Sequence, residues 1–363
     1  MEIGIIGLPS SGKTTIFNAM TRGHAAVAGY ADKANVGVAK VPDLRLDELT
    51  KMYKPQKVVP AEVSYVDVPP PAEGLSKTRG ISGQYLNDLQ RVDALLIVVR
   101  AFEDESVVHV DESVDAFRDV ENMMLELTFS DLELLERRLA RLDDQFKGAK
   151  TVERDAMQKE RALLEQIRGQ LEDGVAIREQ TLTPDQVTQL QGFQFLTSKP
   201  LIVVVNTGED QLDETDNLEK RLAEAASGDG IRTAVICGQL EMDLAQMEPA
   251  DEAEFRESMG AGESGLGRMI QLSYDVVGLI SFLTVGEDEV RAWEVRAGTP
   301  AQQASGKIHS DLERGFIRAE VVSYDDLMSC GSLAEARKRG VLRQEGKEYI
   351  VKDGDIMHVL FNV

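Results

Sequence analysis

The chain begins with the stretch MEIGIIGLPSSGKTT, residues 1–15. An apolar run leads into the spacing G-x-x-x-x-G-K-[ST], which extends from Gly7 to Thr14, and a helical pattern follows it. This order predicts a strand, a glycine-rich loop and a helix. In such a unit the backbone N–H groups surround phosphate oxygens, and the helix dipole faces the same anion. The stretch therefore predicts an α/β P-loop fold with a mostly parallel sheet.

The loop supplies the first candidate site residues. In a P-loop, the lysine at position 13 reaches the β- and γ-phosphates, and the hydroxyl at position 14 ligates Mg²⁺. We expect the rest of the loop and the start of the helix to take part in nucleotide binding as well. The full set is Ser10, Ser11, Gly12, Lys13, Thr14 and Thr15.

A second magnesium ligand is expected at the end of the strand predicted over residues 63–67. An acid in the position of Asp67 holds Mg²⁺ through water in P-loop NTPases. The usual continuation is D-x-x-G, whose glycine N–H contacts the γ-phosphate. Pro70 stands at that position, and proline has no N–H to donate. Pro71 occupies the place where many GTPases carry a glutamine that orients the attacking water.

The first switch loop is expected between residues 24 and 40. Many such loops place a threonine on Mg²⁺, but no threonine lies between Thr21 and Thr50. Asp32 is the obvious replacement ligand, and a solvated loop acid is an equally good interpretation.

The base-binding segment follows an apolar strand predicted over residues 200–206. GTPases carry N-K-x-D here, whose acid accepts two donors from guanine, but this chain has Asn206, Thr207 and Glu209. Because the lysine is replaced and the acid is longer, we expect adenine to be favoured over guanine. The loop after the strand predicted over residues 234–238 would pass the base, with Glu241 just beyond it.

Composition excludes several other classes of protein. A length of 363 residues indicates two or three domains. The net charge of −23 argues against a nucleic-acid binder whose whole surface is basic. We expect Cys237 and Cys330 to be reduced thiols. Glu2 and a predicted strand follow Met1 at once, and no apolar run approaches the roughly 20 residues of a membrane span. These features indicate a cytoplasmic protein.

The remaining pattern predicts two further parts. Apolar residues recur at helical spacing from about residue 111 to 191, with a break at 147–150, and predict a helical hairpin with a solvated charged face. The C-terminal part reads as short strands, expected at 279–283, 291–295, 315–322, 349–352 and 356–361. Basic and aromatic residues lie together at 291–293 and 315–318, as on an RNA-facing surface. The alternative is a β-grasp-like core with ordinary surface charge.

These motifs together resemble the YchF family of Obg-like ATPases over nearly the whole length. The resemblance lies in the P-loop GLPSSGKTTIFNA and in the Asn206-x-x-Glu209 motif. It is most specific in the C-terminal segments Gly306-Lys-Ile-His-Ser-Asp, Gly315-Phe-Ile-Arg-Ala and Leu360-Phe-Asn-Val.

The resemblance implies three parts. They are a nucleotide-binding G domain over 1–110 and 196–277, a helical coiled-coil insertion over 111–195, and a TGS domain over 278–363. It also implies slow hydrolysis of ATP with Mg²⁺ bound through Thr14 and Asp67. His109 matches the histidine that the family is thought to use in place of the glutamine. A monomer that associates with the ribosome or RNA, and with no membrane, is expected.

Two hypotheses remain open at this point. The first is a slow ATPase in which His109 helps to position the attacking water. The second is an adenine-nucleotide-binding adaptor of the ribosome or RNA with little or no hydrolysis. Pro70 and the missing switch-one threonine motivate the second, because both positions normally sense the γ-phosphate.

Overall fold

The computed structural model describes residues 1–23, 34–68, 81, 83–104, 113–148, 150–259 and 264–362. Asp32, Pro70, Pro71 and His109 lie outside these ranges. The chain forms two compact units, one of Met1–Gly37 with Ser64–Met269 and the other of Val38–Val63 with Ile270–Val363. Residues 38–63, which the sequence placed in the first domain, therefore belong with the C-terminal part.

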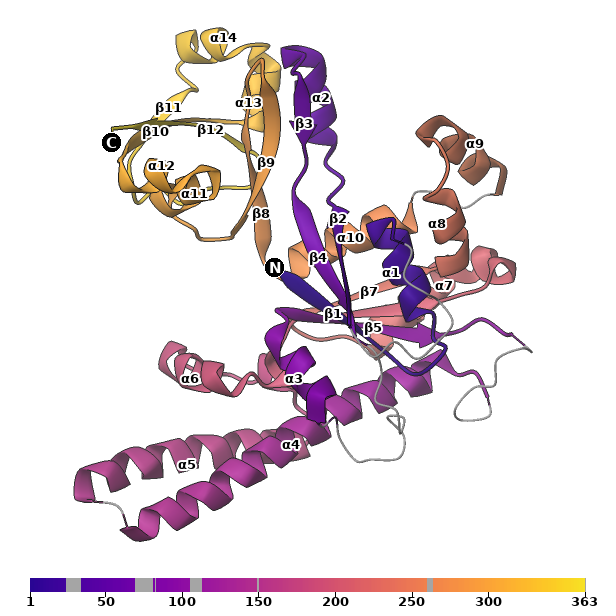
Figure 1. Cartoon of the computed structure of the whole chain (residues 1–363), viewed down its shortest axis with the longest axis vertical. Helices are drawn as coiled ribbons and strands as arrows, with labels where there is room; N and C mark the ends of the chain where they lie inside the picture. Colours follow the sequence, from indigo (N-terminus) through magenta and orange to yellow (C-terminus); the bar gives the residue numbers. More distant parts are fainter. Residues whose placement is uncertain are drawn as a thin grey trace. The chain divides into compact units, whose positions relative to one another are not determined.

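The first sheet has the strand order β2-β4-β1-β5-β6-β7 (Figure 1). Its members are β1 (Glu2–Ile6), β2 (Asn35–Lys40), β4 (Glu62–Asp67), β5 (Ala94–Arg100), β6 (Leu201–Asn206) and β7 (Ile231–Ile236). The pairs β1–β4, β1–β5, β5–β6 and β6–β7 are parallel. Since β4 lies on one side of β1 and β5 on the other, the strand order reverses at β1. In parallel sheets, ligands bind at the carboxyl edge beside such a point.

Helices cover this sheet because its central strands β5 and β6 are buried on both faces. All seven residues of β5 are buried, as expected for a central strand of a parallel sheet. The first unit contains α1 (Lys13–Thr21), α3 (Gly83–Arg91), η4 (Glu209–Glu214), α7 (Thr215–Ala225), α8 (Gly238–Leu244) and α9 (Pro249–Met259). The helix α10 (Gly265–Val276) begins in the first unit and ends in the second.

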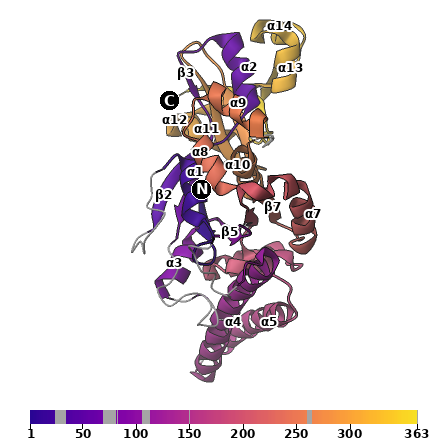
Figure 2. The ribbon, with the colours of Figure 1, turned by 90° about the vertical axis from the view of Figure 1, so that its right-hand side faces the viewer.

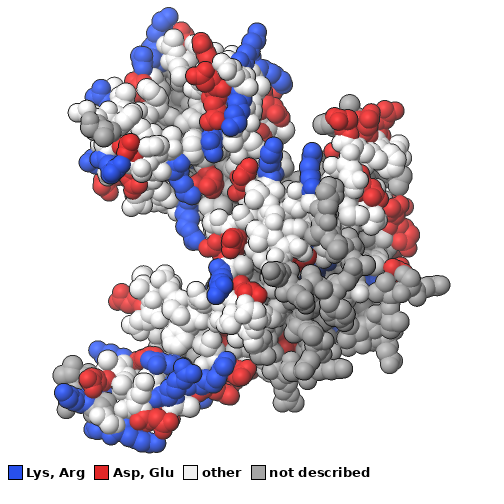
Figure 3. Space-filling model, viewed as in Figure 1, with Lys and Arg blue, Asp and Glu red and all other residues white. Residues whose placement is uncertain are grey.

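A long hairpin of α4 (Ala116–Gly148) and α5 (Thr151–Glu172) extends from the first unit (Figure 2). Its helices share a buried core that includes Leu135, Leu164 and Ile167. Basic and acidic side chains are interspersed on its surface (Figure 3), and ion pairs such as Arg138–Glu160, at 2.7 Å, join them. The charged face is therefore largely self-paired.

The chain returns from the hairpin to β6 through η1 (Ile177–Glu179), α6 (Pro184–Leu190), η2 (Gln191–Phe193) and η3 (Leu196–Ser198). The buried carboxylate of Asp131, on α4, accepts hydrogen bonds from the backbone N–H groups of Leu196 and Thr197 at 2.8 and 2.7 Å. Burial raises the pKa of Asp131 to about 6, against the lowering effect of these bonds. This contact holds the base of the hairpin to the entry of β6.

The second sheet has the order β11-β10-β12-β8-β9-β3. Its strands are β3 (Lys57–Val59), β8 (Leu279–Thr284), β9 (Glu289–Arg296), β10 (Phe316–Ser323), β11 (Arg343–Glu345) and β12 (Asp355–Phe361). The helices of this unit are α2 (Leu44–Tyr53), α11 (Ala301–Ile308), α12 (Ser310–Arg314), α13 (Tyr324–Cys330) and α14 (Leu333–Lys338). Phe282, Phe316 and Met357 contribute to its core.

The strand predicted over 349–352 is wrong. Ile350 forms only an isolated antiparallel bridge with Pro300. The bridge is made by the N–H groups of Ala301 and Val351, which donate to Tyr349 O and Thr299 O at 2.7 and 3.1 Å, and it ends because α11 begins at Ala301. The backbone N–H of Tyr349 instead closes a turn onto Gly346 O at 3.2 Å.

The segment 38–63 is built into the second unit by specific contacts. Strand β3 pairs in parallel with β9. The Arg45 guanidinium, on α2, donates to Asp43 at 2.8 Å and to Asp353 at 2.7 Å.

None of the helices in the described parts of the chain combines the length and apolar character that a membrane span needs.

Candidate functional site

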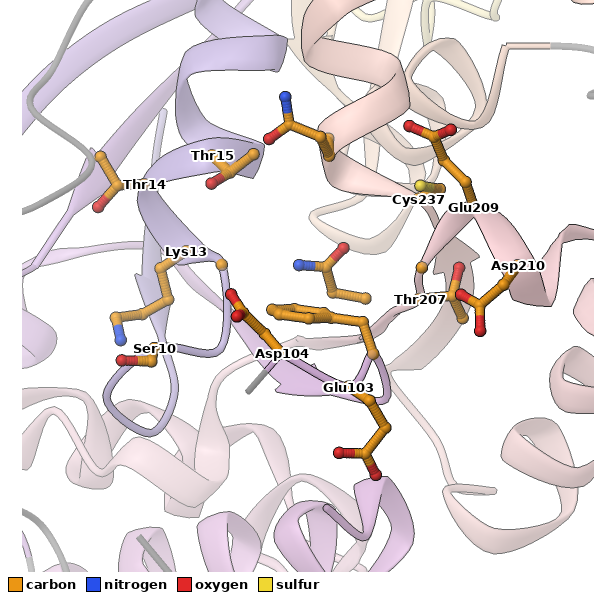
Figure 4. Close-up of a pocket in the computed structure, with 15 residues that line it drawn as sticks. Ser10, Lys13, Thr14, Thr15, Glu103, Asp104, Thr207, Glu209, Asp210 and Cys237 are labelled. Carbon is orange, nitrogen blue, oxygen red and sulfur yellow. The ribbon is translucent and has the colours of Figure 1, made fainter. Parts of the chain in front are cut away.

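A cavity of about 800 Å³ lies at the carboxyl edge of the first sheet. Its walls come from the segments that follow four strands: the loop after β1, residues 102–104 after β5, residues 206–210 at the end of β6, and Cys237 and Gln239 after β7. Figure 4 shows Lys13, Thr14 and Thr15 on one side of this cavity and Thr207, Glu209 and Cys237 on the opposite side. The cavity therefore joins the predicted phosphate and base sites.

Two glycines permit the shape of the phosphate loop. Gly7 and Gly12 have φ angles of 155° and 90°, which side chains rarely adopt. A Cβ atom at Gly7 would lie 2.2 Å from the backbone oxygen of Val98, and one at Gly12 would lie 2.1 Å from Nδ2 of Asn206. The loop can pass this close to β5 and β6 because neither position has a side chain.

Lys13 is folded back onto its own loop. Its Nζ donates to Gly7 O at 3.0 Å and to Leu8 O at 2.8 Å. Burial lowers the pKa of Lys13 to about 8, although the nearby Asp67 carboxylate acts to raise it. The loop thus holds a buried cation at the phosphate side of the cavity, where an anion would compensate its lost hydration.

The predicted magnesium ligands lie together. The Thr14 hydroxyl donates to Oδ2 of Asp67 at 2.9 Å. Mg²⁺ prefers oxygen ligands and commonly takes one or two from the protein, with substrate phosphates and water completing its shell. A hydroxyl beside one carboxylate fits that donor set. In the described part of the chain, no cluster of three or more His, Cys, Asp or Glu side chains offers another metal site.

Asn206 joins the two sides of the cavity. Its Nδ2 donates to Ser11 O at 3.1 Å, and its Oδ1 accepts from the backbone N–H of Gly238 at 2.9 Å. The side chain is 3% exposed. Asn206 therefore ties the phosphate loop to the start of α8, which fixes the width of the cavity.

The two residues that replace the usual Lys and Asp differ in environment. Thr207 is 3% exposed, and its hydroxyl has no hydrogen-bond partner among the described residues. Glu209 is exposed and lines the cavity. The base side thus has one buried hydroxyl and one solvated carboxylate.

The wall formed by residues 102–104 was not predicted from the sequence. Arg100, at the end of β5, is 2% exposed and holds this segment. Its guanidinium donates to Phe102 O at 2.9 Å and to Asp104 O at 3.2 Å, and it lies 4.6 Å from the centre of the Phe102 ring. The sequence did hold a signal for this wall: Arg100 is a charged residue at the end of an otherwise apolar strand.

Two other predicted positions lie away from the cavity. Ser11 is not part of its lining, although its backbone oxygen holds Asn206. Glu241, which the sequence places just beyond the loop expected to pass the base, is buried in a bidentate ion pair with Arg256, with distances of 2.9 and 2.6 Å. Glu241 also accepts from the N–H of Gly265 at 3.0 Å. It joins α8, α9 and α10 rather than facing a ligand.

Two family models match the chain. Residues 2–129 match MMR_HSR1, described as "50S ribosome-binding GTPase". Residues 279–362 match YchF-GTPase_C, described as "Protein of unknown function (DUF933)".

Curated relatives match the full length. The chain is 40% identical to the "Ribosome-binding ATPase YchF" of Bacillus subtilis, covering 100% of both chains. It is 37% identical to the protein of the same name from Escherichia coli O157:H7, covering 100% of this chain and 99% of that one. Among solved structures, the Schizosaccharomyces pombe YchF GTPase is similar with a TM-score of 0.86 and 33% identity, over 99% of this chain and 97% of that chain. The names of these relatives thus include both ATPase and GTPase.

Proposed function

The chain belongs to the YchF family, and from this premise we propose that it is a Mg²⁺-dependent P-loop ATPase that associates with the ribosome. One observation carries the proposal. A single cavity of about 800 Å³ connects the buried cation of Lys13 and the Thr14–Asp67 pair with Thr207 and Glu209 at its other side. Its size and its chemistry suit a nucleoside triphosphate.

The phosphate side supports binding of the triphosphate with a metal ion. Thr14 and Asp67 would hold Mg²⁺. The bound ion would neutralise negative charge on the β- and γ-phosphates. Lys13 would exchange its two bonds to Gly7 O and Leu8 O for bonds to phosphate oxygens. The exchange is favourable because a buried ammonium gains a charged partner in place of neutral carbonyls.

The base side supports ATP over GTP. Guanine recognition by N-K-x-D needs a carboxylate placed to accept two donors. Glu209 carries one more methylene than Asp, and it is exposed at the cavity rim. Adenine presents one exocyclic amine on the same edge. A solvated carboxylate can accept a hydrogen bond from this amine without being held in a fixed position.

We propose His109 as the residue that helps to position the attacking water, although it lies outside the described residues. Pro70, which has no N–H for the γ-phosphate, agrees with hydrolysis that is slow or absent. Ser10, Gly12 and Thr15 line the cavity and would complete the binding site.

The rest of the chain would serve the partner. We propose a nucleotide-binding domain of 1–110 and 196–277, apart from 38–63, a coiled-coil insertion of 111–195 and a TGS domain of 278–363. The names of the curated relatives support the ribosome as the partner, and a ribosome partner would place the protein in the cytoplasm. We propose that it acts as a monomer.

Titration calorimetry with non-hydrolysable ATP and GTP analogues, each with and without Mg²⁺, tests the proposal. We expect ATP to bind at least about tenfold more tightly than GTP, and Mg²⁺ to strengthen binding. Binding of neither nucleotide would overturn the proposal.

Multiple-turnover phosphate release then separates an ATPase from an adaptor. We expect turnover clearly above that of Lys13→Ala, and a further reduction in His109→Ala. Turnover no greater than that of Lys13→Ala would leave an adaptor that binds without hydrolysing. Equal rates for wild type and His109→Ala would remove His109 from the mechanism.

A further inference from the structure

We propose that the carboxylate of Asp104 accepts hydrogen bonds from the 2′- and 3′-hydroxyls of the ribose of a bound nucleotide. The inference rests on the proposed function, because it assigns a sugar subsite to the same cavity. It concerns the segment after β5, which belongs neither to the phosphate loop nor to the base-binding segment. Such a subsite would let the protein distinguish ribonucleotides from deoxyribonucleotides.

Residues 102–104 lie between the phosphate side and the base side of the cavity. A Cβ atom at Gly12, in the phosphate loop, would lie 3.9 Å from Cε1 of Phe102. A Cβ atom at Gly208, after β6, would lie 3.5 Å from Cβ of the same phenylalanine. A nucleotide carries its ribose between its phosphates and its base. This wall is therefore the one beside the sugar of a nucleotide that spans the cavity.

A buried cation holds the backbone of this wall in place. Arg100 is 2% exposed, and its guanidinium donates to Phe102 O at 2.9 Å and to Asp104 O at 3.2 Å. The side chain of Asp104 is exposed, but its backbone is fixed by the second of these bonds. A group that is already positioned loses less conformational entropy when a ligand binds.

Asp104 is the acid placed toward the middle of the cavity. Four acidic residues of the described chain line it: Glu103, Asp104, Glu209 and Asp210. Figure 4 shows Asp104 between Lys13 and Thr207, and Glu103 directed away from them. Glu209 lies on the base side. Asp210 is folded onto Gly208, where its Oδ1 lies 2.4 Å from the position of an added Cβ. Asp104 is thus the carboxylate best placed for the sugar.

A carboxylate suits the two neighbouring hydroxyls of ribose. When ionised, it has two oxygens that only accept, with room for about four hydrogen bonds. The 2′- and 3′-hydroxyls can each donate one, and dinucleotide-binding folds use an acidic residue on ribose in a similar way. Hydrogen bonds to a charged acceptor are stronger than those between neutral groups. A deoxynucleotide lacks one of the two donors and should therefore bind more weakly.

Titrations of wild type and Asp104→Ala with three ligands test the contact. The ligands are ADP, 2′-deoxy-ADP and 3′-deoxy-ADP, each with Mg²⁺, and the diphosphates avoid hydrolysis. We expect wild type to bind ADP about tenfold more tightly than either deoxy ligand. We expect Asp104→Ala to bind all three within about twofold of one another. Loss of a negative charge near the phosphates affects the three ligands alike, so the affinity ratio isolates the contact with ribose.

Two control variants separate a hydrogen bond from a change of charge. Glu103→Ala removes a neighbouring carboxylate from the same wall and should keep the wild-type ratio of ADP to deoxy-ADP affinity. Asp104→Asn removes the charge but keeps one accepting oxygen, and it should retain a ratio of about threefold.

The possible failures differ from each other. Equal binding of ADP and both deoxy ligands to wild type would overturn the inference and leave the proposed function intact. A tenfold ratio that persists in Asp104→Ala, or that is lost equally in Glu103→Ala, would do the same. Absence of ADP and ATP binding to wild type would overturn the proposed function, and the inference with it.

Discussion

The Thr14 hydroxyl donates a 2.9 Å hydrogen bond to Asp67, although 53 residues separate the two along the chain. They meet because β1 and β4 are parallel neighbours, with Ile5 opposite Asp67. The carboxyl ends of both strands therefore reach the same edge of the sheet. The pairing of these two strands is therefore what brings the two side chains together.

We expect Asp67→Asn to abolish most of the strengthening of nucleotide binding by Mg²⁺. The amide keeps a hydrogen-bonding group beside Thr14 but loses the charge that attracts the ion. Titration of a non-hydrolysable ATP analogue should show at least a tenfold smaller Mg²⁺ effect, with binding in EDTA changed by less than about threefold. An undiminished Mg²⁺ effect would exclude Asp67 as a ligand.

We expect Lys13→Met to abolish triphosphate binding and to stabilise the free protein by about 1–2 kcal/mol at pH 7. The pKa of Lys13 is lowered to about 8 in the folded protein, from 10.5, because burial disfavours the ammonium. Below pH 8 both folded and unfolded chains hold the proton, and the cost of burial is constant. From pH 8 to 10.5 only the unfolded chain holds it, so the wild type gains stability as pH rises.

Urea unfolding of Lys13→Met and wild type at several pH values checks this sign. The advantage of the variant should shrink between pH 8 and 10.5. A variant less stable than wild type at pH 7 would mean that the bonds from Lys13 to Gly7 O and Leu8 O outweigh the cost of burial.

We expect Gly12→Ala to destabilise the protein by at least about 2 kcal/mol and to prevent nucleotide binding. Its Cβ would lie 2.1 Å from Nδ2 of Asn206, at a φ of 90°. Gly169, on α5, is a matched control because a Cβ there meets nothing within 4 Å. Gly169→Ala should stabilise by about 0.5–1 kcal/mol through helix propensity. Equal effects of the two substitutions on thermal unfolding would contradict the steric argument.

We expect Glu241→Gln to destabilise the protein by about 3 kcal/mol without changing the preference for ATP over GTP. The change leaves the buried Arg256 without its bidentate partner, and breaking one side of a buried pair is costly. The control Glu252→Gln removes a less buried i,i+4 partner of Arg256 and should cost about 1 kcal/mol or less. Altered base preference in Glu241→Gln would place Glu241 at the base after all.

We expect the double variant Thr207→Lys with Glu209→Asp to shift preference toward GTP. It recreates the N-K-x-D pattern on a strand end already held by Asn206. The ratio of ATP to GTP affinity should fall at least about tenfold in paired titrations. An unchanged ratio would place base selectivity in another part of the cavity, such as residues 102–104.

Local patterns in the sequence predicted the α/β fold with its mostly parallel sheet. The strand, loop and helix over residues 2–21 depend on contiguous residues, so their spacing could be read directly. The hairpin followed from helical periodicity, and the observed break between α4 and α5 lies within 147–150. Side chains within a few positions of each other determine these features.

Tertiary structure alone decided features that need contacts between distant segments. Residues 38–63 join the second unit through β3 and through Arg45 with Asp353, 308 residues away. Asn206 fixes the cavity by bonding Ser11, 195 residues away, and Glu241 is buried against Arg256 rather than facing a base. The spacing of residues along the sequence does not indicate such pairs, because the packing of strands and helices determines which distant residues meet. The sequence by itself thus determined the phosphate loop, and packing determined the cavity around it.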